Sequence, residues 1–444
     1  MKIKKLISVL LATTMIFSLS ACGDSSKDSK VKDTAGVTKS SDSTETPDKA
    51  ITEDVTLTMW TIATESDAFH EPYLQAIADF EEAHPGVTIK METFENESYK
   101  TKIKTAVAAN ELPDVFFTWA GGFSADFVAS GAVLDLDQYY DTYSDKISKA
   151  ALTNVTYDGK LYGSVTCTPV SLMFYNAKIF KENNISVPET MDELKAACQT
   201  LLDAGITPIA TSVKDTWVFN MLGDGLTLKA AGAEATFNAI TRNGVEYGGT
   251  DFLPAAQALV DLNKMGAFID GATGISNDEA SQQFYQGNAA MYFTGSWMAG
   301  SLQTDPENPE DFACAPIPVI NSANASLTDF MGGGSDTLMV SAESEYKDLA
   351  AAATFEITKG VSKYAYLTGA GIPAWKVDYA ADEVPAMTQK IADLCNKATS
   401  FTLWFDTLML SEDAGVYLDL MQQLFVGNIT AEEFDETMNA QLGN

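Results

Sequence analysis

The chain has 444 residues, carries a formal net charge of −33 and is 46% hydrophobic. This acidity argues against binding to nucleic acid or to anionic lipid headgroups, because like charges repel. The chain contains only one arginine, Arg242, and two histidines, His70 and His84, so few groups remain for anion binding or for histidine-based catalysis.

The first residues have the pattern of a bacterial export signal. Three lysines among the first five residues precede the apolar run Leu6–Leu19. That run is shorter than the ~20 apolar residues that span a bilayer, so we expect residues 1–21 to be a cleaved signal peptide. The stretch LSAC, which ends at Cys22, resembles the bacterial lipobox. The resemblance implies that Cys22 is lipidated and anchors the protein to the membrane; an ordinary signal peptide with an incidental cysteine is the alternative.

Residues 22–53 form a polar segment behind this cysteine. From residue 23 onward the segment contains no aromatic residue and almost no large aliphatic one. It cannot bury enough apolar surface to offset its chain entropy, so we expect a disordered linker. A flexible chain of this length reaches on the order of 30 Å. The linker would therefore hold a soluble body near a membrane surface.

Strands and helices alternate from residue 55 onward. The stretch VTLTMW at 55–60 alternates apolar and polar residues, which predicts a strand. We then expect a helix from Pro72, a strand at 87–94, a helix at about 98–110 and a strand at 113–119. This order predicts parallel strands in an α/β layer, with ligands bound beyond the carboxyl ends of the strands.

The alternation restarts after residue 163. We expect strands at 171–176, 206–210 and 289–297, and a Pro-interrupted extended segment at 312–320. We expect helices at 176–183, 190–205, 251–265 and 278–286. Thr190, with Glu193 three residues later, predicts a capping box. A body of about 390 residues exceeds the size of a single core, so two lobes are expected.

Six stretches resemble one known family. They are FEEAHPGVTIKMETF, ELPDVFFTW, FYNAKIFKENNISVPETMDELKAACQTLLDAGITPIA, FYQGNAAMYFTGSW, KDLAAAATFEITKG and VGNITAEEFDETMNAQL. In this order, and behind a lipobox, they resemble the extracellular solute-binding proteins of ATP-driven sugar importers, the maltose-binding-protein-like group. One departure is Asn110–Glu111, where the family often has a glycine before Pro-Asp. We interpret that departure as a loop variation.

The resemblance implies an α/β, periplasmic-binding-protein-like fold, with two lobes joined by crossing hinge segments around a ligand cleft. It implies an N-terminal lobe at 54–163 and 318–362, and a C-terminal lobe at 164–317 and 363–444. It also implies a non-enzymatic monomer on the extracellular face of the bacterial membrane, which delivers a mono- or oligosaccharide to the transmembrane subunits of an ABC permease. No cofactor, metal or nucleic-acid partner is expected.

Sugar chemistry selects the candidate binding residues. A pyranose offers an apolar C–H face to aromatic rings and a rim of hydroxyls to carboxylates, amides and backbone groups. Trp297 is the first candidate, because it follows a Gly-Ser turn at the end of a predicted strand. The further tryptophan candidates are Trp60, Trp119, Trp217, Trp375 and Trp404, for which a place in the core is the alternative. The polar candidates are Glu65, Asp336 and Asp406.

Other functions remain open from the sequence alone. The same fold could bind a polyol, an amino sugar or a polyamine, since the acidic balance keeps a cationic ligand possible. A surface-anchored glycoside hydrolase or lyase is a weaker alternative, because the sequence assigns no carboxylate pair. Metal binding is disfavoured, because the four cysteines after Cys22 form no CxxC pair. The stretch DLDQYYD also lacks the glycine and the distal glutamate of a calcium loop.

Overall fold

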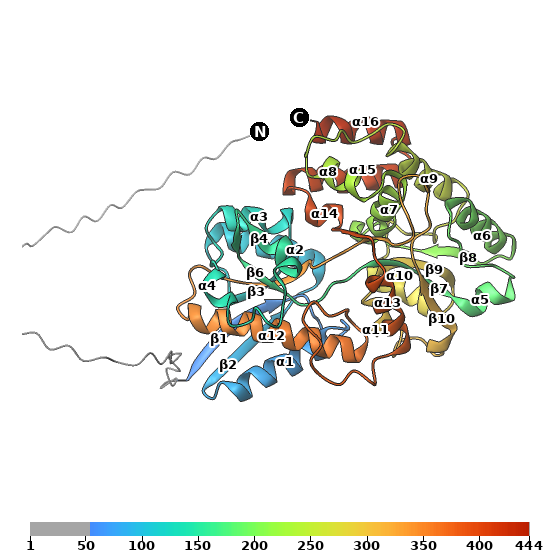
Figure 1. Cartoon of the computed structure of the whole chain (residues 1–444). Coiled ribbons are helices and arrows are strands. Elements are labelled where there is room, and N and C mark those ends of the chain that lie inside the picture. The colour runs from blue at the N-terminus through green and yellow to red at the C-terminus, as the bar shows by residue number, and fades with distance from the viewer. Residues whose placement is uncertain (1–53, 444) are drawn as a thin grey trace, which may run out of the picture. The chain divides into compact units, whose positions relative to one another are not determined.

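The computed structural model describes residues 54–443. These residues form two larger β-sheets with helices packed against them (Figure 1). The predicted α/β class is therefore confirmed. The signal peptide, the lipidated Cys22 and the linker predicted before residue 54 lie outside the described residues. None of the helices between residues 54 and 443 has the length and hydrophobicity needed to span a bilayer.

The first sheet has the strand order β2-β1-β3-β12-β6. Its strands are β1 (Val55–Thr61), β2 (Val87–Thr93), β3 (Val115–Trp119), β6 (Gly163–Val165) and β12 (Asp336–Val340). As predicted, β1 pairs in parallel with β2 and β3, whereas β12 runs antiparallel to β3 and β6. The helices α1 (His70–Ala83) and α2 (Asn96–Ala109) make the crossovers between parallel strands. We call this sheet and its helices the first lobe.

The second sheet has the strand order β10-β7-β9-β8. Its strands are β7 (Ser171–Asn176), β8 (Thr207–Ala210), β9 (Ala289–Gly295) and β10 (Phe312–Ala315). Strand β8 runs parallel to β9, while β7 runs antiparallel to β9 and β10. The helices α5 (Ala177–Glu182), α6 (Met191–Asp203), α9 (Leu253–Lys264) and α10 (Asn277–Tyr285) match the predicted ones. We call this sheet and its helices the second lobe.

Local sequence signals explain several helix starts. The predicted capping box is present, with Thr190 and Glu193 bonding each other's backbone N–H groups at the start of α6. Asn176 caps α5 by accepting a hydrogen bond from the N–H of Ile179 at 3.0 Å. Helix α7 (Thr216–Ala231) was not predicted. Every residue from Val218 to Ala231 is buried, so the helix has no apolar stripe for a sequence pattern to detect.

The rest of the chain completes the two lobes. The remaining helices are α3 (Gly122–Ala129), α4 (Asp137–Tyr140), α8 (Ala233–Ile240), α11 (Met298–Ser301), α12 (Lys347–Thr368), α13 (Ala386–Asn396), α14 (Phe405–Leu408), α15 (Ser411–Phe425) and α16 (Ala431–Leu442), with 3₁₀ turns at Lys149–Val155 and Pro309–Asp311. The short strands are β4 (Thr156–Tyr157), β5 (Lys160–Leu161), β11 (Asp329–Met331) and β13 (Ser400–Thr402). Helix α12 lies beside α1 (Figure 1), whereas α15 and α16 pack against α9 in the second lobe.

Helix α12 contains the position of a lobe boundary that was predicted from the sequence. The lobe boundary between residues 362 and 363 falls inside this helix, which continues to Thr368. After the helix, Trp375 packs into the core of the first lobe, beside Phe355 and Val361. The chain after residue 363 contacts both lobes, since Ile372 packs in the cluster that holds Leu172 and Phe174 of β7.

Two segments connect the sheets: residues 166–170 join β6 to β7, and residues 316–335, which include β11, join β10 to β12. The segment 369–373 runs beside the first of them. Thr168 N–H donates to the carbonyl of Ile372 at 2.8 Å, which joins two of these segments. Gly332 has a φ of +136°, and a Cβ at this position would lie 2.2 Å from the carbonyl oxygen of Pro169. Only glycine permits this close crossing.

Candidate functional site

A cavity of about 590 Å³ is lined by residues of both lobes. The first lobe contributes residues that follow β1 and β2, the end of β3 and the start of β12. The second lobe contributes residues that follow β8, β9 and β13, together with α10. Ligands of α/β sheets bind beyond the carboxyl ends of parallel strands, and this volume is typical of a small-molecule site.

The cavity brings together most of the residues predicted from the sequence. Six of the nine line it: Trp119, Trp217, Trp297, Asp336, Trp404 and Asp406. The other three, Trp60, Glu65 and Trp375, are not among the lining residues.

Trp375 belongs to the core of the first lobe. Its side chain is 4% exposed. Its indole N–H donates to the carbonyl of Val165 at 2.9 Å, and its ring stands edge-on to Tyr143 and Phe355. The ring that follows the Pro-containing turn therefore lies in the core of the first lobe and not in the cavity.

Trp60 and Glu65 lie near the cavity without lining it. Along β1 the residues Leu57, Met59 and Thr61 are buried, so Trp60 points to the opposite face of the strand. There the ammonium group of Lys102 lies 3.9 Å from the centroid of its ring. Glu65 is exposed, and its neighbours on either side in the chain line the cavity instead.

Three tryptophans form a row along the wall contributed by the second lobe. The ring centroids of Trp217 and Trp297 are 6.1 Å apart, and those of Trp297 and Trp404 are 6.0 Å apart. Trp217 and Trp297 are half-buried, whereas Trp404 is only 4% exposed. Trp404 therefore supports Trp297 from behind, and the two half-buried indoles offer apolar surface to the cavity.

The position of Trp297 depends on the glycine two residues before it. Strand β9 is buried along its whole length and ends at Gly295. A Cβ on Gly295 would lie 2.1 to 2.4 Å from carbon atoms of the Trp297 ring. The ring therefore lies flat against the end of the strand, in a place that only glycine leaves open.

A buried carboxyl group fixes the segment that carries Trp404 and Asp406. Asp224 of α7 is fully buried and accepts hydrogen bonds from the N–H of Phe405, at 3.0 Å, and from the hydroxyl of Tyr417. Burial raises the pKa of Asp224 well above its usual value. The indole N–H of Trp404 donates to the Ser171 hydroxyl at 2.7 Å.

Two carboxyl groups and a tyrosine hydroxyl lie on the wall contributed by the first lobe. The Oδ1 atom of Asp67 accepts from the N–H of Phe69 at 2.7 Å, and that of Asp336 accepts from the Ser335 hydroxyl at 3.0 Å. Burial raises the pKa of both carboxyls to about 6, and the charge of Asp336 contributes to the shift of Asp67. Tyr73 is 3% exposed, and its hydroxyl has no hydrogen-bond partner within the part of the chain that the structure describes.

The start of α2 reaches across the cavity. The side chain of Glu95 caps this helix by accepting from the N–H of Ser98 at 3.1 Å. Lys100, one turn later, bonds Glu97 at 2.9 Å and lies 4.0 Å from the Oδ2 atom of Asp406 in the second lobe. Burial raises the pKa of Asp406, and the charge of Lys100 opposes this shift. Lys100 thus links the two walls.

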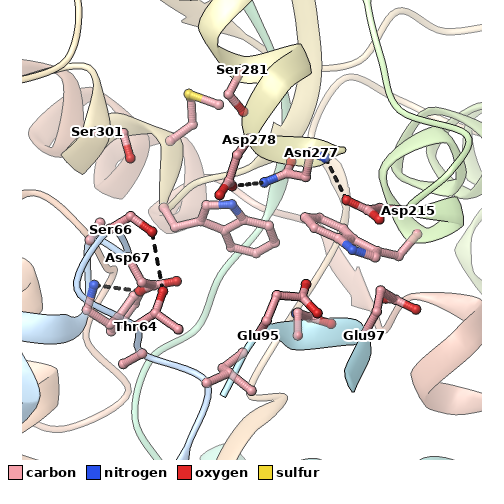
Figure 2. A pocket seen from close by; sticks show the side chains of 18 of the residues that line it. Thr64, Ser66, Asp67, Glu95, Glu97, Asp215, Asn277, Asp278, Ser281 and Ser301 are labelled. Carbon is pink, nitrogen blue, oxygen red and sulfur yellow. Dashed lines mark hydrogen bonds between the residues drawn. The ribbon is translucent and has the colours of Figure 1, made fainter. Parts of the chain in front are cut away.

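The second lobe adds polar groups around Asn277. The N–H of Asn277 donates to the Oδ2 atom of Asp215 at 2.6 Å, and its Oδ1 atom accepts from the Tyr292 hydroxyl at 2.8 Å. Asp278 follows in the first turn of α10. Figure 2 shows Asp215, Asp278 and, from the first lobe, Asp67 around the same space.

The cavity is strongly acidic. Its carboxyl groups are those of Asp67, Glu95, Glu97, Asp215, Asp278, Asp305, Asp336 and Asp406, against two ammonium groups, those of Lys100 and Lys214. Within residues 54–443, no group of three or more His, Cys, Asp or Glu side chains is arranged to hold a metal ion.

Most of these carboxyl groups are not predicted from the sequence. Asp67, Glu95 and Asp215 each follow a strand that is parallel to its neighbour, namely β1, β2 and β8. The rule that places ligands at strand ends would have found them, had it been applied to polar residues as well as to tryptophans. For Asp278 and Asp305 no comparable signal exists.

Comparison with known proteins places the chain in a family. The model of the bacterial extracellular solute-binding proteins matches residues 63–355. An uncharacterised ABC transporter extracellular-binding protein of Pyrococcus horikoshii is 26% identical over 63% of this chain and 65% of its own length.

Two solved structures are also similar. One, from a study of xylan utilization by the thermophilic bacterium Caldanaerobius polysaccharolyticus, is 36% identical with a TM-score of 0.83, over 87% of this chain and 99% of that chain. The other, a chitin oligosaccharide binding protein, is 25% identical with a TM-score of 0.79, over 88% of this chain and 98% of that chain. The predicted periplasmic-binding-protein-like fold is thereby confirmed, and the chain belongs to the bacterial extracellular solute-binding protein family.

Proposed function

We propose that this protein binds an oligosaccharide in the cavity between its lobes and delivers it to the permease of an ABC importer. The main observation in support of the proposal is that an aromatic wall and a wall with carboxyl groups face the same cavity. The half-buried rings of Trp217 and Trp297 line one side, and the carboxyl groups of Asp67 and Asp336 line the other. Apolar rings match the C–H faces of pyranoses, and carboxylates match their hydroxyls.

The similar proteins support a saccharide as the ligand. The two solved structures come from work on xylan utilization and from a chitin oligosaccharide binding protein. A multiple sugar-binding protein of Streptococcus mutans is a further relative, 23% identical over 52% of this chain. The family consists of solute-binding proteins of transporters, which supports a receptor rather than a hydrolase.

Each lining group has a role in this proposal. Trp297 and Trp217 stack on sugar faces, and Trp404 holds Trp297 in place. Asp67 and Asp336 accept hydrogen bonds from sugar hydroxyls. Closure of the lobes around the ligand would bring both walls into contact with it, because a ligand that touches both walls favours the closed state.

A lipid anchor forms the second part of the proposal. We propose that Cys22 carries the lipid anchor, so that the body is held at the extracellular face of the membrane, near the permease. The support is the sequence pattern around Cys22 and a family whose members are extracellular.

A ligand screen tests the proposed function. The purified protein is heated with xylo-oligosaccharides, chitin oligosaccharides, polyols and polyamines, and each stabilising compound is then titrated by calorimetry. A ligand that binds only the native state raises the melting temperature, by ~2.7 kcal/mol of stability at a hundredfold excess over Kd. We expect a linear oligosaccharide to give the largest increase. If no saccharide stabilises the protein, the proposed function is wrong.

The acidic lining favours one second candidate, a cationic solute such as a polyamine. Eight carboxyl groups against two ammonium groups would attract it. The same screen separates the two candidates. Stabilisation by spermidine without stabilisation by any saccharide would replace the sugar with a polyamine.

A further inference from the structure

We infer that the cavity selects its ligand by charge: it accepts uncharged oligosaccharides and rejects those that carry a uronic acid carboxylate. This inference rests on the proposed function and deepens it, because it names the class of saccharide. The residues responsible are Asp67, Asp336 and Asp278, with Tyr73 beside them.

Of the two ammonium groups that line the cavity, one is paired with carboxylates of the protein and the other is exposed to solvent. The ammonium group of Lys100 bonds Glu97 at 2.9 Å and faces Asp406 at 4.0 Å. Lys214 is an exposed residue, and its charge acts on Glu279 of α10. Lys100 cannot receive a sugar carboxylate without leaving a carboxylate of the protein unpaired, and the ammonium group of Lys214 is already surrounded by solvent.

The arginine that would suit a carboxylate is also absent from the cavity. Carboxylates are bound best by the two parallel N–H groups of a guanidinium. The single arginine of the chain is Arg242. Its guanidinium bonds Asp413 at 2.6 Å and the carbonyl of Gln441 at 2.8 Å, away from the lining residues.

A second observation, independent of the acidic residues, points to a neutral ligand. The hydroxyl of Tyr73 is buried and lines the cavity, and among residues 54–443 it forms no hydrogen bond of 3.5 Å or less, although the side chain of Thr61 lies near it. A buried polar group without a partner is costly, so this hydroxyl is available to a ligand. It can donate to or accept from a sugar hydroxyl, as the neighbouring carboxylates can accept from one.

The carboxyl groups lie close enough to influence one another. The charges of Asp336 and of Asp278, which belongs to the other wall, both oppose ionisation of Asp67. A ligand carboxylate at this place would add a further negative charge beside these half-buried and exposed carboxyl groups, and like charges at short range repel. A neutral hydroxyl adds none.

The experiment compares two ligands that differ only in charge. Calorimetry measures the affinity of the protein for xylotriose, for xylotriose with a 4-O-methylglucuronic acid branch, and for the methyl ester of that branched sugar. The ester keeps the size of the branch and removes its charge. We expect xylotriose and the ester to bind, and the acid to bind at least tenfold more weakly than the ester at low ionic strength.

Salt and variants then identify the cause. The ratio of ester to acid affinity should fall in 0.5 M NaCl, because salt screens charges. It should also fall severalfold in the double variant Asp67→Asn/Asp336→Asn and in Asp278→Asn. The side chain of Asp278 is exposed, so this substitution leaves the core unchanged. The control is Glu182→Gln, which removes the same charge at an exposed position outside the lining.

The outcomes are distinct. Equal affinities for acid and ester, whether strong or immeasurable, would overturn selection by charge. If the acid still binds more weakly than the ester in salt and in the variants with the three aspartate substitutions, the shape of the branch and not its charge causes the difference in affinity. If the screen finds no saccharide ligand, the proposed function fails and the inference fails with it. If neutral saccharides bind and the acid binds as well as the ester, only the inference fails.

Discussion

The two walls of the cavity differ in the way they are built. The second lobe presents a row of indole rings, held by a glycine at a strand end and by a buried hydrogen bond from Trp404 to Ser171. The first lobe presents carboxyl groups and an unpartnered hydroxyl on loops and at strand ends. The aromatic wall stabilises the fold as well as offering a surface. The polar wall costs stability, because the half-buried carboxyl groups of Asp67 and Asp336 repel each other. Binding to the polar wall recovers part of that cost.

The largest predicted effect is at the aromatic wall. In Trp297→Ala the apolar contact with a sugar face is lost, which corresponds to about 2–3 kcal/mol, or roughly a hundredfold in affinity. Calorimetry with the best ligand of the screen measures this change, and thermal unfolding of the ligand-free variant measures its stability.

The matched control is a tryptophan of the core. Trp375→Ala should lower the free energy of unfolding by roughly 3–5 kcal/mol and leave the affinity of the folded fraction unchanged. A Trp297→Ala variant that melts far lower, yet binds normally in the cold, would show that Trp297 belongs to the core as Trp375 does. The second lobe would then offer no aromatic binding surface at this position, and the proposed difference between the two walls would be wrong.

At the polar wall the effect should be about tenfold. Asp336→Asn keeps the shape of the side chain but replaces a charge-assisted hydrogen bond with a neutral one, which weakens binding by about 1.5 kcal/mol. The melting temperature of the ligand-free variant should stay unchanged or rise, because a half-buried carboxylate that repels Asp67 has been removed. A lower melting temperature with unchanged affinity would contradict a role in binding.

Acidification should separate stability from affinity. The pKa values of Asp67 and Asp336 are raised to about 6 in the folded protein, against a usual value near 3.8. Between pH 4 and 6 the folded state therefore binds more protons than the unfolded state, so these groups increase the stability as the pH falls from 7 toward 4. The charges of Asp278 and His70 also act on Asp67, in opposite directions.

Affinity should change in the opposite sense. Protonated carboxyls are poorer acceptors, so sugar affinity should fall severalfold between pH 7.5 and pH 5. Thermal unfolding without ligand and calorimetry with ligand, over the same pH series, test both parts. An affinity that is constant over this range would show that neither carboxyl contacts the sugar as an ionised acceptor.

The smallest effect should come from the link between the walls. In Lys100→Gln the ion pair with Asp406 is lost, and a partly exposed pair of this kind contributes about 0.5 kcal/mol. We expect a two- to threefold weaker affinity and a smaller salt dependence of binding. The control is Lys102→Gln on the same helix, whose ammonium group lies over Trp60, outside the lining residues. Equal effects of the two substitutions would exclude a role for the link.

Much of the fold could be predicted because the local signals agree with the tertiary structure. The parallel strands β1, β2 and β3, and the capping box at Thr190, were read from periodicity and from cap residues. Helix α7 could not be read in this way, because burial on all sides removes the contrast between its faces.

The site was predictable to a smaller extent. Trp297 and Trp217 were found because tryptophans near strand ends are few and conspicuous. Trp375 also follows a turn and was as good a candidate for the cavity, but its ring lies in the core. The local sequence does not distinguish the two cases, because the path of the whole chain determines where the ring lies. Asp67 and Asp278 belong to different lobes and are distant in sequence, yet the charge of one acts on the other. No local sequence pattern predicts this proximity.

The spacing of the tryptophan row has an optical consequence. Trp217, Trp297 and Trp404 follow one another with ring centroids about 6 Å apart, close enough for efficient exchange of excitation energy between indoles. A ligand that covers the two half-buried rings changes the polarity around the emitting group, while Trp60 and Trp375 outside the lining supply a constant background. Ligand binding in the cavity should therefore change the intrinsic tryptophan fluorescence of the protein, so that occupancy can be measured without any added label.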